Sequence, residues 1–137
     1  MKHNPLRQLA TLGQSVWLDD IRRAWLADGT LARFLEQDRV SGLTSNPAIF
    51  ERSITHDPGY DDAIAAARRA GISAAALYEA LAVDDIRRAA DLLLPVYERS
   101  GKRDGYVSLE VSPEIADQTL PPSRKQGGCG RESRVRI

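Results

Sequence analysis

Cysteine and histidine are scarce in this chain of 137 residues, and a net charge is absent. The single cysteine, Cys129, excludes an internal disulfide and any metal site built from several cysteines. The two histidines, His3 and His56, lie too far apart in sequence for a helical zinc pair, so we expect no metal site. Basic and acidic side chains each total 19, a balance without the basic excess of a nucleic-acid-binding protein.

Long apolar stretches are also missing from the sequence. No run approaches the roughly 18 apolar residues that would indicate a membrane-spanning helix, so we expect no membrane partner. The N-terminal sequence MKHNPLRQL has no apolar segment of the kind found in a secretory signal peptide. We therefore expect a cytoplasmic location.

The distribution of charge divides the chain into two parts. Residues 1–119 carry 14 basic and 18 acidic side chains, whereas residues 120–137 carry five basic and one acidic. The second part, LPPSRKQGGCGRESRVRI, has few apolar residues and no periodic pattern. Such a segment cannot bury enough surface to offset the entropy lost on ordering. We predict one folded portion over residues 1–119 and a disordered tail from Leu120.

Three short runs of strand-forming residues alternate with helical patterns. The segments predicted as strands are QSVWLDD (14–20), VSGLTSN (40–46) and DGYVSLEVSPE (104–114). Helices are predicted over residues 4–13, 21–29, 30–38, 46–54, 60–71, 73–82 and 83–101. Strands separated by helices indicate an α/β fold with a parallel sheet and right-handed crossovers.

Several residues mark the predicted helix boundaries. Asn4 and Asn46 each precede a proline, the pattern of an N-cap followed by proline in the first turn. Thr30 is predicted as the N-cap of the helix after Gly29, and Pro95 is predicted to kink or divide the last helix. An apolar stripe on that helix is expected to face the core. Its residues are Ile86, Ala89, Ala90, Leu93 and Tyr97.

Polar side chains gather where each predicted strand ends. They are Asp19, Asp20, Thr44, Ser45, Asn46 and Glu110. The C-terminal ends of parallel strands lie on one side of a sheet, where active sites form. Taken singly, these side chains also fit helix caps or a solvated strand face. Glu110 is the hardest to explain in that way, since a carboxylate inside a buried strand must be paired or functional.

Three sequence blocks, SVWLDDIRR, GLTSNPAIF and DGYVSLEVSPEIADQT, resemble transaldolases, specifically the longer bacterial type sometimes fused to a glucose-6-phosphate isomerase. The resemblance covers residues 4–119 and implies a partial (β/α)8 TIM barrel, made of the first three β/α units and the N-terminal helix. It also implies transfer of a dihydroxyacetone unit from sedoheptulose 7-phosphate or fructose 6-phosphate to an aldose phosphate. This reaction of the pentose phosphate pathway uses a lysine Schiff base and no metal or organic cofactor.

The same resemblance implies roles for the residues at the strand ends. Asp19 would handle substrate hydroxyl protons during carbon–carbon cleavage, and Glu110 would act through a water as general acid and base. Thr44 and Asn46, with Ser45 between them, would hold the dihydroxyacetone portion by hydrogen bonds. These residue types suit the chemistry, because a carboxylate assists the loss of water and the iminium then stabilises the carbanion without a metal.

The lysine that the resemblance requires has no counterpart in the matching blocks. The chain has Lys2 at the terminus, Lys102 in a polar turn and Lys125 in the predicted tail, and none lies within an apolar strand. A complete barrel takes about 250 residues. We therefore interpret the chain as a truncated transaldolase reading frame, shifted after Thr119, and expect no activity from it alone.

Three other interpretations stay open at this point. A catalytically inactive fragment with two open sheet edges would act through self-association. A different Schiff-base aldolase barrel would use the same strand ends on another sugar phosphate. A small helical binding module would suit the alanine-rich region, 63–94, but would not explain the polar clusters at the strand ends.

Overall fold

The computed structural model of the chain describes residues 4–110, in which helices alternate with three short strands. Three strands and the predicted helices are observed, with residues 73–82 and 83–101 joined in one long helix. Residues 111–114 of the third predicted strand lie outside the described residues. The predicted tail from Leu120 lies outside the described residues. In chain order the elements are α1 (Pro5–Thr11), β1 (Val16–Leu18), α2 (Arg23–Ala27), α3 (Thr30–Gln37), β2 (Val40–Ser45), α4 (Pro47–His56), the 3-10 helix η1 (Pro58–Tyr60), α5 (Asp61–Arg69), α6 (Ala74–Arg99) and β3 (Tyr106–Leu109).

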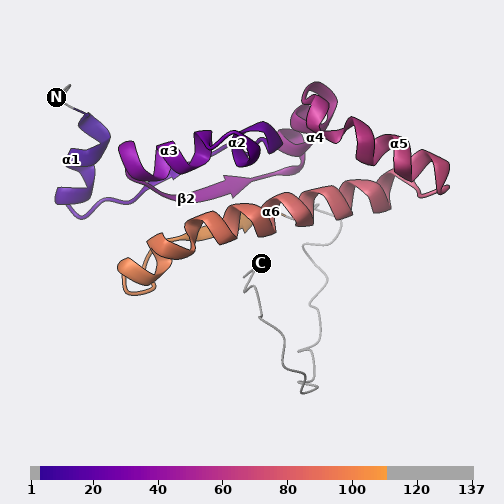
Figure 1. The fold of residues 1–137 in the computed structure, drawn as a ribbon. Coiled ribbons are helices and arrows are strands. Elements are labelled where there is room, and N and C mark those ends of the chain that lie inside the picture. Colours follow the sequence, from indigo (N-terminus) through magenta and orange to yellow (C-terminus); the bar gives the residue numbers. More distant parts are fainter. Residues whose placement is uncertain (1–3, 111–137) are drawn as a thin grey trace, which may run out of the picture.

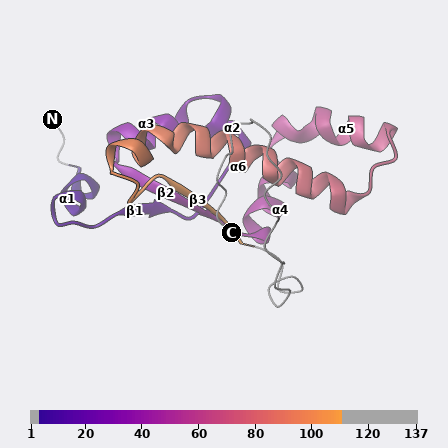
Figure 2. The same cartoon turned by 90° about the horizontal axis from the view of Figure 1, so that it is seen from below.

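The strands form one parallel sheet in the order β1-β2-β3, as the alternation of strands and helices predicts. Helices α2, α3 and α6 lie together on one side of this sheet (Figures 1 and 2), and α6 contacts both β2 and β3. This is a mixed α/β arrangement, consistent with part of a TIM-barrel-type domain. Within residues 4–110, β1 and β3 each have one neighbouring strand, so each presents an open edge in this part of the chain. Self-association through these edges stays a prediction.

The hydrophobic core lies between the sheet and the helices on that side. Strands β2 and β3 contribute Leu43 and Val107, and α6 contributes Ile86, Ala89 and Leu93. These three α6 side chains are at most 1% exposed, and the other two members of the predicted stripe are partly buried. The stripe is therefore confirmed, and it explains why α6 packs along the sheet.

The N-terminal ends of the helices agree with two predicted caps and differ from a third. The side chains of Asn4 and Asn46 cap α1 and α4, each followed by proline, as predicted. Thr30 was expected to cap α3, but the N-cap is Gly29, which adopts the left-handed conformation with φ of 78°. Thr30 is already helical, and its N–H donates to the side chain of Asp28 instead.

Helix α6 runs unbroken through Pro95. Of the two predicted outcomes, a kink or a division, the division is therefore not observed. An interior proline costs a helix about 3 kcal/mol, because it lacks an N–H and crowds the preceding turn. The buried side chains of Leu93 and Val96 lie on either side of Pro95, and their packing against the core offsets that cost. No helix within residues 4–110 is both long enough and apolar enough to cross a membrane.

The turn between α6 and β3 depends on Gly105. Its φ is 86°, in the left-handed region that favours glycine. Its N–H donates to the carbonyl oxygen of Ser41 at 2.7 Å, which ties the turn to β2. A Cβ at this position would overlap the backbone of Tyr97 in α6. Both the backbone conformation and the close packing therefore require glycine.

We expect Gly105→Ala to lower the free energy of unfolding by about 2–5 kcal/mol, the combined cost of left-handed strain and overpacking. Gly101→Ala is the matched control, because Gly101 also has a positive φ, of 64°, but a Cβ there would meet no atom within 4 Å. The control should lower the free energy of unfolding only by the cost of the left-handed strain, about 1–2 kcal/mol. Urea denaturation followed by circular dichroism measures both, and equal losses would contradict the packing argument.

Candidate active site

A hydrogen bond joins the C-terminal ends of β1 and β2. The hydroxyl of Thr44 in β2 donates to Oδ1 of Asp19, the residue after β1, at 2.6 Å. The two residues are 25 positions apart in sequence, so only the pairing of the strands brings them together. Asp19 is exposed and Thr44 is partly exposed. The predicted meeting of polar side chains at this edge is therefore observed for these two residues.

Strand β3 adds two further polar residues to the same face of the sheet. Ser108 is level with Thr44 in the parallel pairing of β3 with β2, and Glu110 lies two positions further along. Alternate residues of a strand share a face, so both lie opposite the side on which Val107 enters the core. We refer to Asp19, Thr44, Ser108 and Glu110 as the polar edge.

Glu110 differs from its prediction in one respect. Strand β3 ends at Leu109, and Glu110 is exposed rather than inside a buried strand. Its N–H still donates to the Ser45 carbonyl oxygen at 3.0 Å, which keeps its backbone beside β2. The argument from a buried carboxylate therefore does not apply, because the side chain lies on the face away from the core. Its place on the polar edge is what connects it with Asp19 and Thr44.

Ser45 and Asn46 lie next to Thr44 in sequence but are used differently. Ser45 is 1% exposed, and its hydroxyl donates to the Ser108 carbonyl oxygen at 2.9 Å, on the core side of the sheet. Asn46 caps α4, since its Oδ1 atom accepts from the N–H of Ile49 at 2.9 Å. The cap occupies the oxygen of the Asn46 amide and leaves its Nδ2 group as a donor.

Asp20 also turns away from the polar edge. It accepts a hydrogen bond from the N–H of Ile21 at 2.9 Å and forms ion pairs with Arg22 and Arg52 at 3.0 and 3.3 Å. Helix α2 does not begin at Ile21 but two residues later, so a capping role for Asp19 or Asp20 at Ile21 is not observed. The group that accepts from the first turn of α2 is the distant Asp57, described below.

A model of the transaldolase/fructose-6-phosphate aldolase family matches residues 16–121, which include all three strands. The chain belongs to this family. The transaldolase family membership inferred from the three sequence blocks is therefore confirmed, and it agrees with a parallel sheet that carries polar residues at its C-terminal edge.

Curated relatives give the same result. The transaldolase of Thiobacillus denitrificans is 49% identical over 116 residues, which cover 85% of this chain and 32% of that protein. Transaldolase 2 of Nostoc punctiforme is 46% identical over 119 residues, 87% of this chain and 31% of that protein. The transaldolase of Neisseria gonorrhoeae is 45% identical over 111 residues, with 81% and 31% covered. The chain thus spans about a third of the length of these transaldolases.

The described residues place no lysine at the polar edge. Lys102 is the one lysine within residues 4–110, and it is exposed in the turn that precedes β3. That turn lies at the N-terminal end of β3, opposite to the end followed by Glu110. Residues 4–110 also hold no group of three or more histidine, cysteine, aspartate or glutamate side chains positioned to bind a metal ion.

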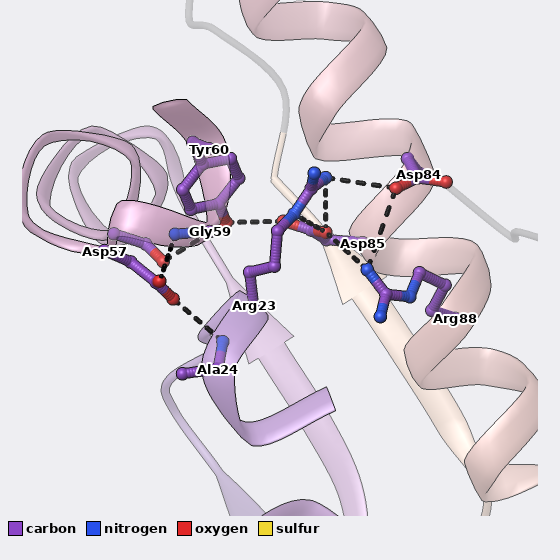
Figure 3. A network of polar contacts seen from close by, with 9 residues as sticks. Arg23, Ala24, Asp57, Gly59, Tyr60, Asp84, Asp85 and Arg88 are labelled. Atoms are coloured by element: carbon purple, nitrogen blue, oxygen red, sulfur yellow. Dashed lines mark hydrogen bonds and ion pairs between the residues drawn. The ribbon is translucent and has the colours of Figure 1, made fainter. Parts of the chain in front are cut away.

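A second polar cluster, which the sequence reasoning missed, lies in the helical layer (Figure 3). Asp85 of α6 is 0% exposed, and it accepts hydrogen bonds from the Tyr60 hydroxyl and the Arg23 guanidinium. Arg23 also pairs with Asp84 at 3.0 Å and lies over the Tyr60 ring, 4.4 Å from its centroid. Nearby, Asp57 accepts from the N–H groups of Ala24 and Gly59, at 2.8 and 2.9 Å.

The electrostatics of this cluster follow from burial. Burial raises the pKa of Asp85, and the hydrogen bonds from Tyr60 and Arg23 act in the opposite direction. Burial also raises the pKa of the Tyr60 hydroxyl, as does its bond to Asp85, so this group stays protonated and remains a donor. The cluster joins α2, η1 and α6 on the helical side of the sheet. We therefore regard it as structural support for the loop that carries Asp19.

The sequence held one signal for this cluster. Asp85 lies three residues after Ala82 and four before Ala89, both of which are buried. It is thus on the same face of α6 as the predicted stripe. A charged residue on a buried helical face requires a partner, although the spacing does not identify Arg23 or Tyr60 as that partner.

We expect Asp85→Ala to lower the free energy of unfolding by about 3–5 kcal/mol, because it leaves the partly buried Arg23 without its buried partner. Asp84→Ala is the matched control, since Asp84 is the adjacent residue and binds the same arginine but is 56% exposed. The loss for this exposed pair should be less than about 1 kcal/mol. Chemical denaturation measures both variants, and similar losses would show that burial of the pair does not matter.

Proposed function

We propose that the polar edge is part of a transaldolase active site, which moves a dihydroxyacetone unit from a ketose phosphate to an aldose phosphate in the pentose phosphate pathway. The observation that supports this most is the 2.6 Å hydrogen bond between Thr44 and Asp19, found at the C-terminal edge of a parallel sheet in a member of this family. Side chains at this edge of an α/β fold are well placed to meet a ligand.

Each residue has a role that its surroundings allow. Asp19 takes and returns substrate hydroxyl protons as the carbon–carbon bond breaks and forms, and the bond from Thr44 holds its carboxylate in one orientation. Glu110 is exposed, so it can act through a water as general acid and base. Asn46 binds the dihydroxyacetone portion through Nδ2, because its Oδ1 caps α4.

The reaction also needs an amine nucleophile. A lysine attacks the substrate ketone, water is lost, and the resulting iminium accepts the electron pair released by bond cleavage. Lys102 is the one lysine in the described part of the chain, and it lies at the wrong end of β3 for this task. We therefore infer that the polar edge, together with Asn46, supplies substrate binding and proton transfer, and that this chain alone is inactive.

A chimaera in which residues 4–119 replace the homologous part of the Thiobacillus denitrificans transaldolase tests the proposed roles. We expect turnover of fructose 6-phosphate with erythrose 4-phosphate in a coupled assay. Glu110→Gln should lower kcat by about 10²–10⁴-fold, the size of a general acid–base contribution. Glu79→Gln, which alters an exposed carboxylate on α6, should retain activity. A folded but inactive chimaera, or equal kcat values for the two variants, would refute the proposal.

The isolated chain should form no stable adduct when it is treated with borohydride in the presence of fructose 6-phosphate. Borohydride fixes only an iminium that a competent lysine has formed, and intact-mass spectrometry detects the fixed product. The unmodified chimaera described above serves as the positive control. Turnover by the purified chain that Glu110→Gln abolishes would show that the inferred inactivity is wrong.

A further inference from the structure

The pairing of β1 with β2 shifts by one residue near the start of the two strands. Val16 is level with Val40, but the next residue of β1, Trp17, is level with Gly42. Ser41 is therefore an extra residue on β2, which makes this irregularity a β-bulge. A bulge re-aims the side chains that follow it, and bulges are frequent beside active sites.

The bulge decides which side chains of β2 reach the polar edge. After it, Leu18 is level with Leu43, and both pack in or against the core, so Asp19 and Thr44 share the opposite face. If Ser41 paired regularly with Trp17 and no bulge formed, the register of the preceding pair, Val16 with Val40, would place Asp19 level with Leu43. Thr44 would then turn toward the core, because a one-residue slip exchanges the faces of a strand. The hydrogen bond between Asp19 and Thr44 therefore depends on the bulge.

Ser41 holds the bulge on both sides. Its hydroxyl donates to the carbonyl oxygen of Val16 at 3.0 Å, and its own carbonyl oxygen accepts from the N–H of Gly105 at 2.7 Å. Ser41 is 9% exposed, so a substitution that removes the hydroxyl deprives a sheltered carbonyl of this donor. One residue thus ties the shifted register to β1 and to the turn before β3.

Trp17 and Gly42 fix the same register from the other side, on the face of the sheet that carries the polar edge. The indole lies against Gly42, where a Cβ would overlap the ring. A slip of one residue in either direction would bring the indole level with Ser41 or Leu43, both of which carry side chains. Trp17 is 40% exposed, so its contact with Gly42 is distinct from the core on the helical side. Only a residue without a Cβ admits the indole at this level of the sheet.

We propose that Ser41, Gly42 and Trp17 form a register lock that positions Asp19 against Thr44. All three are positioning residues, because they act through the Asp19–Thr44 pair. The importance of that pair for catalysis rests on the proposed function, whereas the lock itself is a property of the β1–β2 pairing. The two can therefore be tested separately.

NMR spectroscopy of the full chain tests the lock without any ligand. The readout is the nuclear Overhauser effect between the Thr44 methyl group and the Asp19 β protons, which reports that the two side chains are adjacent. Ser41→Ala and Gly42→Ala should each lose this signal. The methyl resonances of the core residue Leu93 should keep their positions, because the packing of α6 stays intact.

A rescue and a control separate positioning from stability. Gly42→Ala combined with Trp17→Ala should regain the signal, since loss of the indole leaves room for the new methyl group and Ser41 still holds the bulge. Ser45→Ala removes another buried hydroxyl of β2, one that donates to Ser108 on the core side. This control should lower the stability of the chain yet retain the signal between Thr44 and Asp19.

Either of two results would overturn the register lock. One is retention of the signal in Ser41→Ala and Gly42→Ala, and the other is its loss in the Ser45→Ala control. If Gly42→Ala does not fold, the double variant decides, because failure of Trp17→Ala to rescue it also counts against the lock. Failure of the proposed function has a different signature, an inactive chimaera alongside the expected NMR pattern.

Discussion

The parallel pairing of β1 with β2 is the constraint on which the rest of the structure depends. One face of this ladder brings Asp19 to Thr44, and the other brings Leu18 to Leu43 at the core. Because side chains alternate along a strand, the polar edge and the core are two results of one register. A change of register would therefore displace the polar edge and the core side chains together, and the bulge at Ser41 determines that register.

The helical layer is fixed by a different kind of contact. Apolar packing of α6 on the sheet is strong but has little directionality, so it does not by itself determine how α2 meets α6. The planar Arg23 guanidinium donates to Asp84 and Asp85 of α6 and lies over Tyr60 of η1. Such fork-like geometry restricts relative rotation more than a methyl contact does. The loop that precedes Arg23, with Asp19 in it, is therefore held from the helical side as well as by the ladder.

Features set by local sequence could be predicted. Asn46 followed by proline specified a cap, and apolar residues at helical spacing specified the buried face of α6.

The partners of Asp85 could not be predicted, because Arg23 lies 62 residues away and no local pattern encodes that distance. The bulge at Ser41 was missed for the same reason, because a bulge is defined by the pairing of β2 with β1, which is distant in sequence. The exposure of Glu110 was missed because strand-forming neighbours do not specify which face of a strand is covered.

Asp57 has a consequence for how the chain folds as it is synthesised. This one carboxylate accepts from the first turn of α2, through Ala24, and from η1, through Gly59. Helix α2 has five residues, too few to persist in water without help, and Arg23 within it pairs with Asp84 and Asp85 of α6. On the ribosome, α2 therefore gains its contacts with Asp57 and with α6 only after those later segments have been synthesised.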